Sequence, residues 1–454
     1  MDILRSPLWD DIADIVNVGE YNGAKYSIML HTPDDSHEEG DYPAFKLISI
    51  DIERDYVHNY ADVITVKCHI PLGEYIKRIR PSGHQTDQNL EASLFIKTDV
   101  DEFVIRYKAI IPTQDINDID HDLLDGYDEE SLDSQDVHLA VFQLVDTVVE
   151  PLPRLVIDGV YDGVTRGDIL TYGIETITKN LVVTGRSPID KVDLTQPNNM
   201  ERVSNLVIPT GTKLLNLANY LQNEQGGIYT GGIHNYIQTR NRKAIWYIYP
   251  PYDTTRYNDR EEKLIVYLLP GKYPDEYDRT VVTEGNITRI LASSHTSSLD
   301  AQDRPSNKLP LGFRINNADE VLNRPHKVKP GKDIVGTRGT VSKKYLSRHS
   351  LDSLDIVSEA STVITNNIYV PASAISKTDG TRMDIIWNKS DPTRLRPGMS
   401  VKIYREHNDK ILEMDATLLF NHTLYAIPGK GGLSDEYRTK TMMTLFVDND
   451  VKEL

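Results

Sequence analysis

Four acidic residues stand at the spacing of calcium ligands. They occupy the first, third, fifth and twelfth positions of a calcium-binding loop: Asp118, Asp120, Asp122 and Glu129. Carboxylate oxygens at these positions surround the ion in such loops. The sixth position is Leu123, where the sharp turn requires glycine, and no convincing amphipathic helices flank the segment. We therefore expect a solvated acidic loop, with calcium binding as the weaker alternative.

A glycine-rich stretch, "GGIYTGGIHNY" at 226–236, raises the question of a phosphate-binding loop. A Walker loop needs Gly-Lys-Ser/Thr after its second glycine, but Gly231 is followed by Gly232, Ile233 and His234. A dinucleotide fingerprint places its glycines before a helix, whereas these follow the helical pattern of 212–225. The order predicts a helix that ends at a left-handed glycine, followed by a tight turn into a strand. We expect no nucleotide site here.

Other catalytic signatures are absent from the sequence. It contains no His-Glu-x-x-His motif and no Gly-x-Ser-x-Gly elbow. The single cysteine, Cys68, falls on the apolar face of an alternating segment, which predicts a packing role. We therefore expect no catalytic residue, no metal and no cofactor. A carboxylate pair cannot be chosen among 68 acids, so a cell-wall hydrolase stays open as an alternative.

One aromatic cluster could act at a surface. Its members lie between 246 and 257: Trp246, Tyr247, Tyr249, Tyr252 and Tyr257. Alternation places Tyr247 and Tyr249 on one strand face and Trp246 on the other. We interpret the cluster first as core, second as a subunit interface, and third as a platform that stacks on sugar rings. The third interpretation would make the chain a carbohydrate- or receptor-binding protein.

Composition limits the partners of the chain. It has 454 residues, 39% of them hydrophobic, with a formal net charge of −18. A strongly acidic chain repels phosphate backbones, which argues against nucleic-acid binding as its main task. No apolar run approaches the roughly 18 residues that a membrane span requires. Acids occupy the N-terminal residues where a signal peptide needs bases, so we expect no membrane insertion and no signal-directed export.

Periodicity divides the chain into β-rich ends and a mixed middle. Apolar residues alternate with polar ones around 47–53, 63–70, 103–109 and 137–149, as in strands with one buried face. Thr165 and Asp168 form a capping box at the start of a helical pattern. We expect a β-rich α+β, multi-domain fold. Its parts are an N-terminal barrel-like domain (1–150, with the acidic loop 114–136), a mixed α/β region (151–291), a polar linker (292–345) and a C-terminal barrel-like domain (346–454).

Three segments resemble baseplate hub proteins of tailed bacteriophages. The segment "IPTGTKLLNLANYLQNEQGGIYTGGIHNYIQTRNRKAIWYIYPPYD" is similar to a hub segment in which a helix is followed by Gly-Ile-Tyr, a strand and an aromatic stretch. "FKLISIDIERDYVHNYADVITVKCHIPLGEY" looks like the first tube domain of such hubs, and "LRPGMSVKIYREHNDKILEMDATLLFNHTLYAI" like their later β domain. The likeness spans most of the chain apart from the acidic loop and residues 292–345.

The resemblance implies a structural, non-enzymatic role. It implies a homotrimer whose two barrel-like domains per chain form a sixfold ring between the tail tube and the central spike. The type VI secretion spike proteins have a similar N-terminal architecture. Partners would include the tube and spike proteins, with tape-measure and surrounding baseplate proteins as further candidates. The protein would be made in the host cytoplasm and reside in the virion, with DNA only in passage. The net charge further suggests an acidic lumen that repels this DNA.

Overall fold

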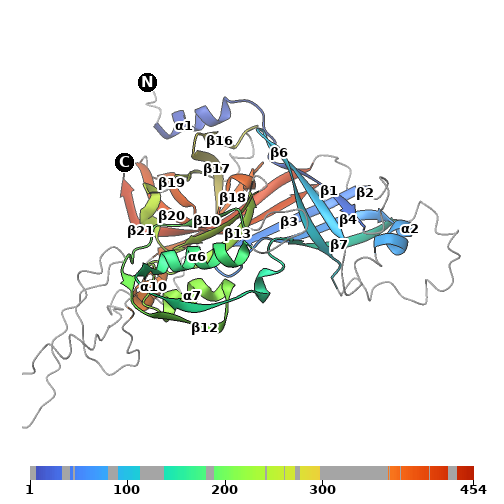
Figure 1. The fold of residues 1–454 in the computed structure, drawn as a ribbon. Helices are drawn as coiled ribbons and strands as arrows, with labels where there is room; N and C mark the ends of the chain where they lie inside the picture. The colour runs from blue at the N-terminus through green and yellow to red at the C-terminus, as the bar shows by residue number, and fades with distance from the viewer. Residues whose placement is uncertain are drawn as a thin grey trace, which may run out of the picture.

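The computed structural model describes residues 7–32, 41–43, 46–79, 90–112, 137–179, 189–240, 243–259, 261–270, 277–296, 367, 369–378, 380–407, 410–427 and 437–453. Strands dominate these residues, which confirms the β-rich, multi-domain expectation (Figure 1). The acidic loop 114–136, with Asp118, Asp120, Asp122 and Glu129, lies outside the described residues, as do linker residues 297–345. Among the described helices, none is long and apolar enough to cross a membrane.

Six strands close into a barrel in the C-terminal half. They are β15 (Lys263–Leu269), β17 (Ile287–Thr296), β18 (Gly380–Asn388), β19 (Ser400–His407), β20 (Lys410–Ala426) and β21 (Arg438–Glu453). The ring closes because β19 pairs with β15 in parallel and with β20 in antiparallel orientation. A short strand, β16 (Val281–Glu284), pairs with β17. Thus β15 and half of β17, which fall within the range expected for the mixed region, complete the barrel of the C-terminal strands.

Alternating side chains fill the interior of this barrel. Trp387, Ile385 and Val401 are fully buried in one cluster with Met443 and Leu445. Each of these side chains points to the inward face of its strand. The residues next to it along the strand are more exposed, as a two-residue period requires. The Trp387 indole donates to Thr280 Oγ1 at 3.1 Å, so its one polar atom is satisfied. The barrel is therefore a packed core and not a pore.

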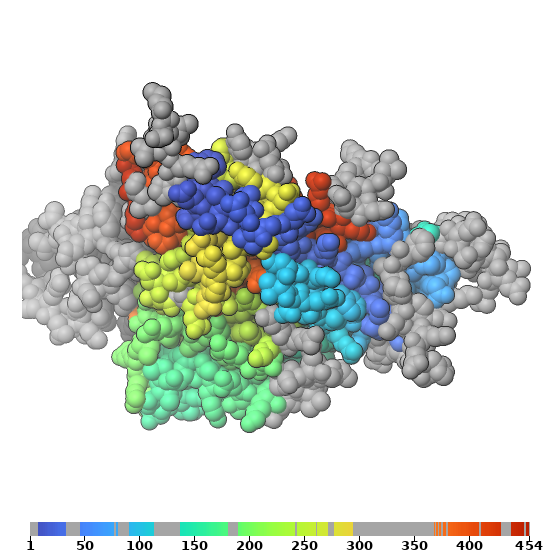
Figure 2. All heavy atoms as spheres, turned by 90° about the horizontal axis from the view of Figure 1, so that it is seen from above, coloured from blue at the N-terminus to red at the C-terminus, as the bar shows by residue number. Residues whose placement is uncertain are grey.

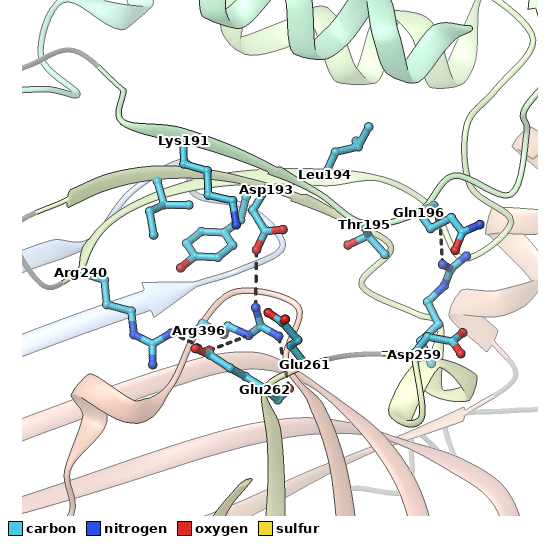
Figure 3. A pocket seen from close by; sticks show the side chains of 13 residues that line it. Lys191, Asp193, Leu194, Thr195, Gln196, Arg240, Asp259, Glu261, Glu262 and Arg396 are labelled. Atoms are coloured by element: carbon cyan, nitrogen blue, oxygen red, sulfur yellow. Dashed lines mark hydrogen bonds and ion pairs between the residues drawn. The ribbon is translucent and has the colours of Figure 1, made fainter. Parts of the chain in front are cut away.

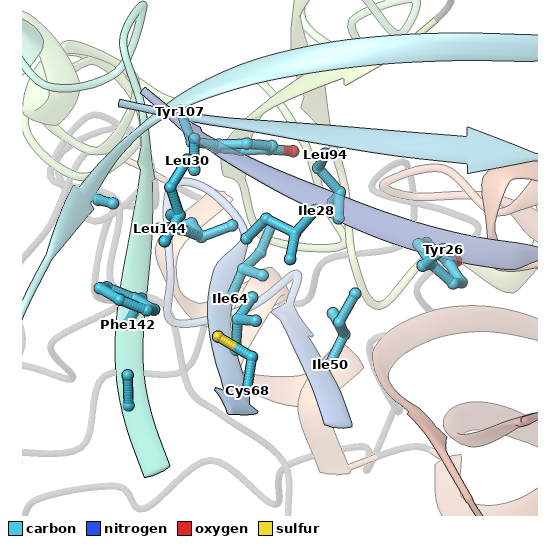
Figure 4. Close-up of a cluster of buried hydrophobic side chains, with 14 of the residues drawn as sticks. Tyr26, Ile28, Leu30, Ile50, Ile64, Cys68, Leu94, Tyr107, Phe142 and Leu144 are labelled. Atoms are coloured by element: carbon cyan, nitrogen blue, oxygen red, sulfur yellow. The ribbon is translucent and has the colours of Figure 1, made fainter. Parts of the chain in front are cut away.

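The N-terminal strands form a second curved sheet. They are β1 (Lys25–His31), β2 (Asp41–Pro43), β3 (Lys46–Asp55), β4 (Val63–Pro71), β5 (Glu91–Lys97), β6 (Glu102–Ile110) and β7 (Val137–Asp146). Their order is β3-β4-β7-β6-β5-β1-β2. Inward side chains of opposite strands, such as Ile28 and Phe142, meet in one cluster (Figure 4). Cys68 is buried in this cluster, as its position on the apolar face predicted, and burial raises the pKa of its thiol to about 12.

One long strand joins the two β structures. β20 spans 17 residues, and its first half pairs with β19 in the barrel. Its second half, Phe420–Ala426, pairs with β3 of the N-terminal sheet. β21 follows β20 along both halves, with register shifts near Asp415 and Leu419. The two structures are therefore parts of one 14-stranded sheet.

The mixed α/β region lies beside this sheet, at the bottom of Figure 1. It contains α6 (Arg166–Thr178), α7 (Leu217–Asn223), η2 (Leu152–Arg154), η3 (Leu214–Asn216), β8 (Val156–Tyr161), β9 (Val164–Thr165), β10 (Lys191–Leu194), β11 (Arg202–Val203), β12 (Leu206–Lys213), β13 (His234–Arg240) and β14 (Lys243–Tyr249). The predicted capping box is confirmed, because Thr165 and Asp168 each accept from the other's backbone N–H. The expected helix 212–225 is shorter: a 3-10 turn leads into α7.

The stretch 226–232 is shaped by packing. Gly226 and Gly227 have φ angles of +91° and +80°, which residues with a side chain rarely adopt. A Cβ atom on Gly227 would collide with the ring of Tyr369, the first residue of α10 (Tyr369–Thr378). The Gln222 amide satisfies the turn, since its Oε1 accepts from the backbone N–H of Ile228 at 2.8 Å. The glycines therefore end α7 and leave the space in which α10 packs. Their role is to form a turn of the required shape.

The first helix covers part of the barrel. α1 (Pro7–Val16) packs Leu8 and Ile15 onto Tyr267 and Leu291, on the outer side of β15 and β17. The Tyr267 hydroxyl donates to Asp11 at 3.0 Å. Seen from above, the dark-blue helix lies across the yellow strands (Figure 2). The N-terminal residues thus bury an apolar barrel face that would otherwise be open to water.

Candidate functional site

The structure places most of the predicted aromatic cluster in the interior. Trp246, Tyr247, Tyr249 and Tyr252 are each less than 5% exposed. Trp246 donates from its indole to Asn235 Oδ1 at 3.2 Å, and the Tyr249 hydroxyl donates to the Tyr56 carbonyl at 2.7 Å. These contacts come from the chain itself. Buried rings offer no platform to a sugar or to another subunit.

Tyr257 is the member of the cluster that reaches the surface. It lies in η4 (Thr254–Tyr257) and is half-buried. The ammonium groups of Lys263 and Lys402 lie 5.1 and 5.0 Å from the centre of its ring. Such cation–π contacts stabilise the charged groups against the aromatic face. Its ring is thus engaged by neighbouring side chains of the barrel.

A polar cavity lies where the mixed region meets the barrel. Its volume is about 310 Å³, within the size range of small-ligand sites. One wall is β10 with the residues that follow it, and the other comes from the segments that lead into β15 and β19 (Figure 3). The lining residues are Lys191, Asp193, Leu194, Thr195, Gln196, Arg240, Ile245, Tyr247, Arg256, Asp259, Glu261, Glu262 and Arg396. Clefts between structural units are common places for ligand sites.

An ion-pair network crosses the inner part of this cavity. Glu262 Oε2 lies 2.6 Å from the Arg240 guanidinium and 3.1 Å from Arg396 Nε. Arg396 also lies 3.5 Å from Asp193 Oδ2, on the opposite wall. Burial alone would raise the pKa of Glu262, but the cations of Arg240, Arg396 and Lys191 outweigh burial and lower it. Glu262 is therefore a stable carboxylate that holds the two walls together, and a poor proton donor.

Two features of the cavity have unused bonding capacity. Thr195 is only 5% exposed, and its Oγ1 atom has no hydrogen-bond partner among the described residues. At the mouth, the exposed carboxylates of Asp259 and Glu261 have no ion pair with a described residue. Arg256, in contrast, is already bound to Asp253 at 2.6 Å and to the Gln196 carbonyl at 2.7 Å. The two exposed carboxylates therefore keep free acceptor oxygens, whereas the Thr195 Oγ1 atom is closed off from the solvent.

Sequence reasoning missed this cavity. Its residues come from three separate stretches, near 191–196, 240–262 and 396. Nothing in their spacing along the sequence indicates that they lie close together. β10 pairs with β14 in parallel, and the periodicity of the sequence does not specify the register of that pairing. The one usable signal was the charged run "DREEK" at 259–263, directly before an apolar strand. Among the described residues, no cluster of His, Cys, Asp and Glu could hold a metal ion.

Known proteins that are similar to this chain come from solved structures, at low sequence identity. No protein-family model matches it, and no curated protein matches it. Among solved structures, it is similar to a Francisella PdpA–VgrG complex described as half-lidded, with 9% identity and a TM-score of 0.38. That alignment covers 100% of this chain and 62% of the other.

Two further structures are similar at the same level. One is the E. coli c3393 protein, described as a component of the type VI secretion system with structural similarity to the T4 bacteriophage tail proteins gp27 and gp5. It shares 8% identity over 93% of this chain and 76% of its own, with a TM-score of 0.40. The other is the 43 kDa tail protein of prophage MuSo2 from Shewanella oneidensis, with 9% identity, coverage of 93% and 96%, and a TM-score of 0.37.

Proposed function

We propose that this chain is a structural, non-enzymatic hub of a phage tail baseplate. In this role, copies of the chain form a ring that joins the tail tube to the central spike and surrounds part of the DNA channel. The observation that carries the proposal is the strand β20, which makes one continuous sheet of the closed barrel and the N-terminal sheet. A rigid double unit of this kind is what a ring with two β structures per chain requires.

The outer face of this shared sheet suits a wall of the ring. Paired outward residues run across it in register, such as Ile386 with Met442, His422 with Glu53, and Thr65 with Gln143. None of these side chains is fully buried, and they are mainly polar. The face therefore forms a broad, wet surface that spans both β structures.

The charge of this face differs from the acidic lumen suggested by the net charge. It carries the acids Asp51, Glu53 and Asp384 and the bases Lys67, Arg438 and Lys440. Mixed signs leave little net field for a passing phosphate backbone. We therefore propose a channel that avoids adhesion by charge balance, with DNA present only in passage.

The oligomeric state tests the proposal. Native mass spectrometry of the full chain should show a trimer of the 51.5 kDa subunit, alone or on mixing with a tail tube protein. Negative-stain images of that species should show a ring with a central opening. A chain that stays monomeric under both conditions would contradict the hub. The aromatic cluster that suggested sugar binding is largely interior, so it no longer supports that alternative. No feature of the described residues favours a hydrolase.

A further inference from the structure

We propose that the acidic segment 114–136 binds to the outer face of the shared sheet, at the end where the bases of that face gather. We call this end of the face the basic end. Its four bases are Lys46 in β3, Lys67 in β4, and Arg438 and Lys440 in β21. The inference concerns two parts of one chain, so it does not depend on the hub function.

The strand register brings the four bases together. One row of directly paired residues crosses four strands on the outer face: Arg438 (β21), Ala426 (β20), Ser49 (β3) and Lys67 (β4). With neighbouring strands about 4.8 Å apart, this row is about 14 Å long. Lys440 follows Arg438 by two residues and shares its face, and Lys46 lies opposite His69, next to Lys67. This end lies far from the barrel, beside α2 (Leu72–Glu74), which follows β4 directly (Figure 1).

The bases of this end have no counter-charge. Lys46 is partly buried and the other three are exposed, and none has an ion pair with a described residue. Among the described acids of the face, Asp51 lies in the row of Lys440, but it is bound by His422 at 2.5 Å. Glu53 lies one row closer to the barrel. Four unpaired bases in a chain of net charge −18 create a local field that attracts anionic groups.

The basic end also exposes apolar side chains. Val137 and Leu139, on the same face at the start of β7, are 45% and 49% exposed. Leu424, which pairs with Lys440, is 39% exposed. Apolar groups that lie open to water beside unpaired charges are typical of a contact surface. The partner of this surface should therefore combine acids with apolar side chains.

The acidic segment has this composition. Residues 114–136 contain ten acids and no Lys or Arg. Large apolar residues are interleaved with the acids: Ile116, Ile119, Leu123, Leu124, Tyr127 and Leu132. The acids would pair with the four bases, and the apolar residues would remove the exposed Leu139 and Leu424 from water.

The segment also ends in the right place. It leads into Val137, which pairs with Pro71 at the same end of the sheet. Arg438 lies four strands across from Val137 and four residues along, a distance of about 23 Å. Half of the 24 residues between Pro112 and Val137 spans up to about 40 Å when extended, so the segment reaches every base. Because both of its ends are tethered to this sheet, its effective concentration there exceeds that of a separate acidic partner.

Carbodiimide cross-linking of the full chain tests the contact, because it joins a carboxylate to an amine that touches it. Mass spectrometry should show links from acids of 114–136 to Lys46, Lys67 or Lys440, and these links should vanish at about 1 M salt, where the Debye length is about 3 Å. Lys25, exposed on β1, is the internal control. In a mixture of unlabelled and isotope-labelled chains, each link should join residues of one isotope. Links that mix isotopes, or links to Lys25 as frequent as those to Lys67, would overturn the proposal.

Substitutions locate the binding on the basic end. Lys67→Gln with Arg438→Gln should speed the hydrogen exchange of the segment's amides about fivefold, as expected for the loss of two exposed ion pairs. The matched control, Lys25→Gln with Arg202→Gln, removes an exposed lysine and an exposed arginine elsewhere and should leave the exchange unchanged. Both variants should keep the wild-type melting temperature. Exchange that is the same in the wild type and in both variants would contradict the contact.

A short DNA duplex tests the competing partner, since a phosphate backbone would use the same bases. The segment is neutralised by five substitutions: Asp118→Asn, Asp120→Asn, Asp122→Asn, Glu129→Gln and Glu130→Gln. This variant should bind the duplex about tenfold more tightly than the wild type in about 0.1 M salt, and Lys67→Gln with Arg438→Gln should reverse the gain.

The control for this experiment has the same change in net charge. It neutralises five exposed acids elsewhere in the described residues: Asp10, Asp14, Glu20, Asp158 and Glu175. This control should bind the duplex no more tightly than the wild type. An equal gain in both neutralised proteins would show that only net charge matters. A wild type that binds as tightly as the neutralised variant would show that the bases are free for DNA, and either result would overturn the proposal.

Discussion

The Arg54 guanidinium donates from Nε to the Asp62 carboxylate at 2.9 Å, in the interior of the protein. The other oxygen of Asp62 accepts from the Tyr236 hydroxyl at 2.8 Å, and Arg54 also donates to the Pro392 carbonyl at 3.2 Å. These four residues belong to β3, the β3–β4 connection, β13 and η5 (Pro392–Arg394). One ion pair therefore links the N-terminal sheet, the mixed region and the approach to the barrel.

Removal of the acid from this pair should be strongly destabilising. Burial would lower the pKa of Arg54, but Asp62 together with Tyr56, Tyr236 and Tyr26 outweighs burial and raises it, so Arg54 stays charged. Asp62→Ala would leave that charge buried without its partner, at a cost of about 3–5 kcal/mol. The measurement is the urea midpoint followed by tryptophan fluorescence. Asp158→Ala, at an exposed position, is the control, and equal midpoints for the two variants would contradict the prediction.

Acid should weaken the contact between the N-terminal sheet and the mixed region through His234. This ring stacks on Tyr60, and its Nε2 lies 2.8 Å from the Asn59 carbonyl that accepts from it. Burial lowers the pKa of His234 below 6.5, more than the Asn59 carbonyl and Asp55 raise it. The folded protein then binds fewer protons than the unfolded chain, so the stability is present above about pH 6.5 and declines as the pH falls below it.

His234→Asn should remove part of this pH dependence. An asparagine amide can still donate to the Asn59 carbonyl but does not titrate, so the fall in melting temperature between pH 7.5 and 5 (values that bracket the ordinary histidine pKa of about 6.5) should become smaller. His407→Asn, on the exposed end of β19, should retain the wild-type slope. Identical slopes in all three proteins would show that His234 does not titrate in this range.

Gly227→Ala should loosen the attachment of α10. The substitution combines an unfavourable positive φ with a collision against Tyr369, and we expect a loss of about 2–4 kcal/mol. Gly163→Ala is matched, because Gly163 has a φ of +72° but nothing within 4 Å of the added atom, and should cost only about 1 kcal/mol. Melting temperatures measure both variants. Equal losses would mean that the space beside Tyr369 is not limiting.

Asp99 should stabilise the junction between the two β structures. This turn residue lies 2.5 Å from Arg279 and 3.1 Å from Arg394, and its side chain is 22% exposed. Asp99→Ala should cost about 1–2 kcal/mol, more than an ordinary surface pair, because Arg279 loses its carboxylate partner and Arg394 keeps only Asp391. Glu102→Ala removes the exposed pair with Lys97 and should change the urea midpoint little. A larger fall in the urea midpoint for Glu102→Ala than for Asp99→Ala would contradict the prediction that Asp99 stabilises the junction.

Local features were predictable from the sequence because they depend on neighbouring residues. Alternation predicted the strands that contain Ile50 and Val66, spacing predicted the capping box at Thr165, and Gly226 was expected to end the helix. The pairing of β15 and β17 with strands more than 80 residues away was not predictable, since periodicity gives a strand's face and not its partner. Other distant contacts were equally unpredictable: Arg396 lies beside Glu262 in the cavity, and Leu419 and Phe446 pack on Tyr252.

The shared strand β20 also has a mechanical consequence. Its backbone runs without a break from the barrel into the N-terminal sheet, and β21 is bonded along both halves. A pull that separates the two β structures lengthwise would load these ladder hydrogen bonds in shear, so many must rupture together instead of one by one. A junction of this kind resists stretching far better than a flexible tether, and it would pass a push or twist received at one end directly to the other.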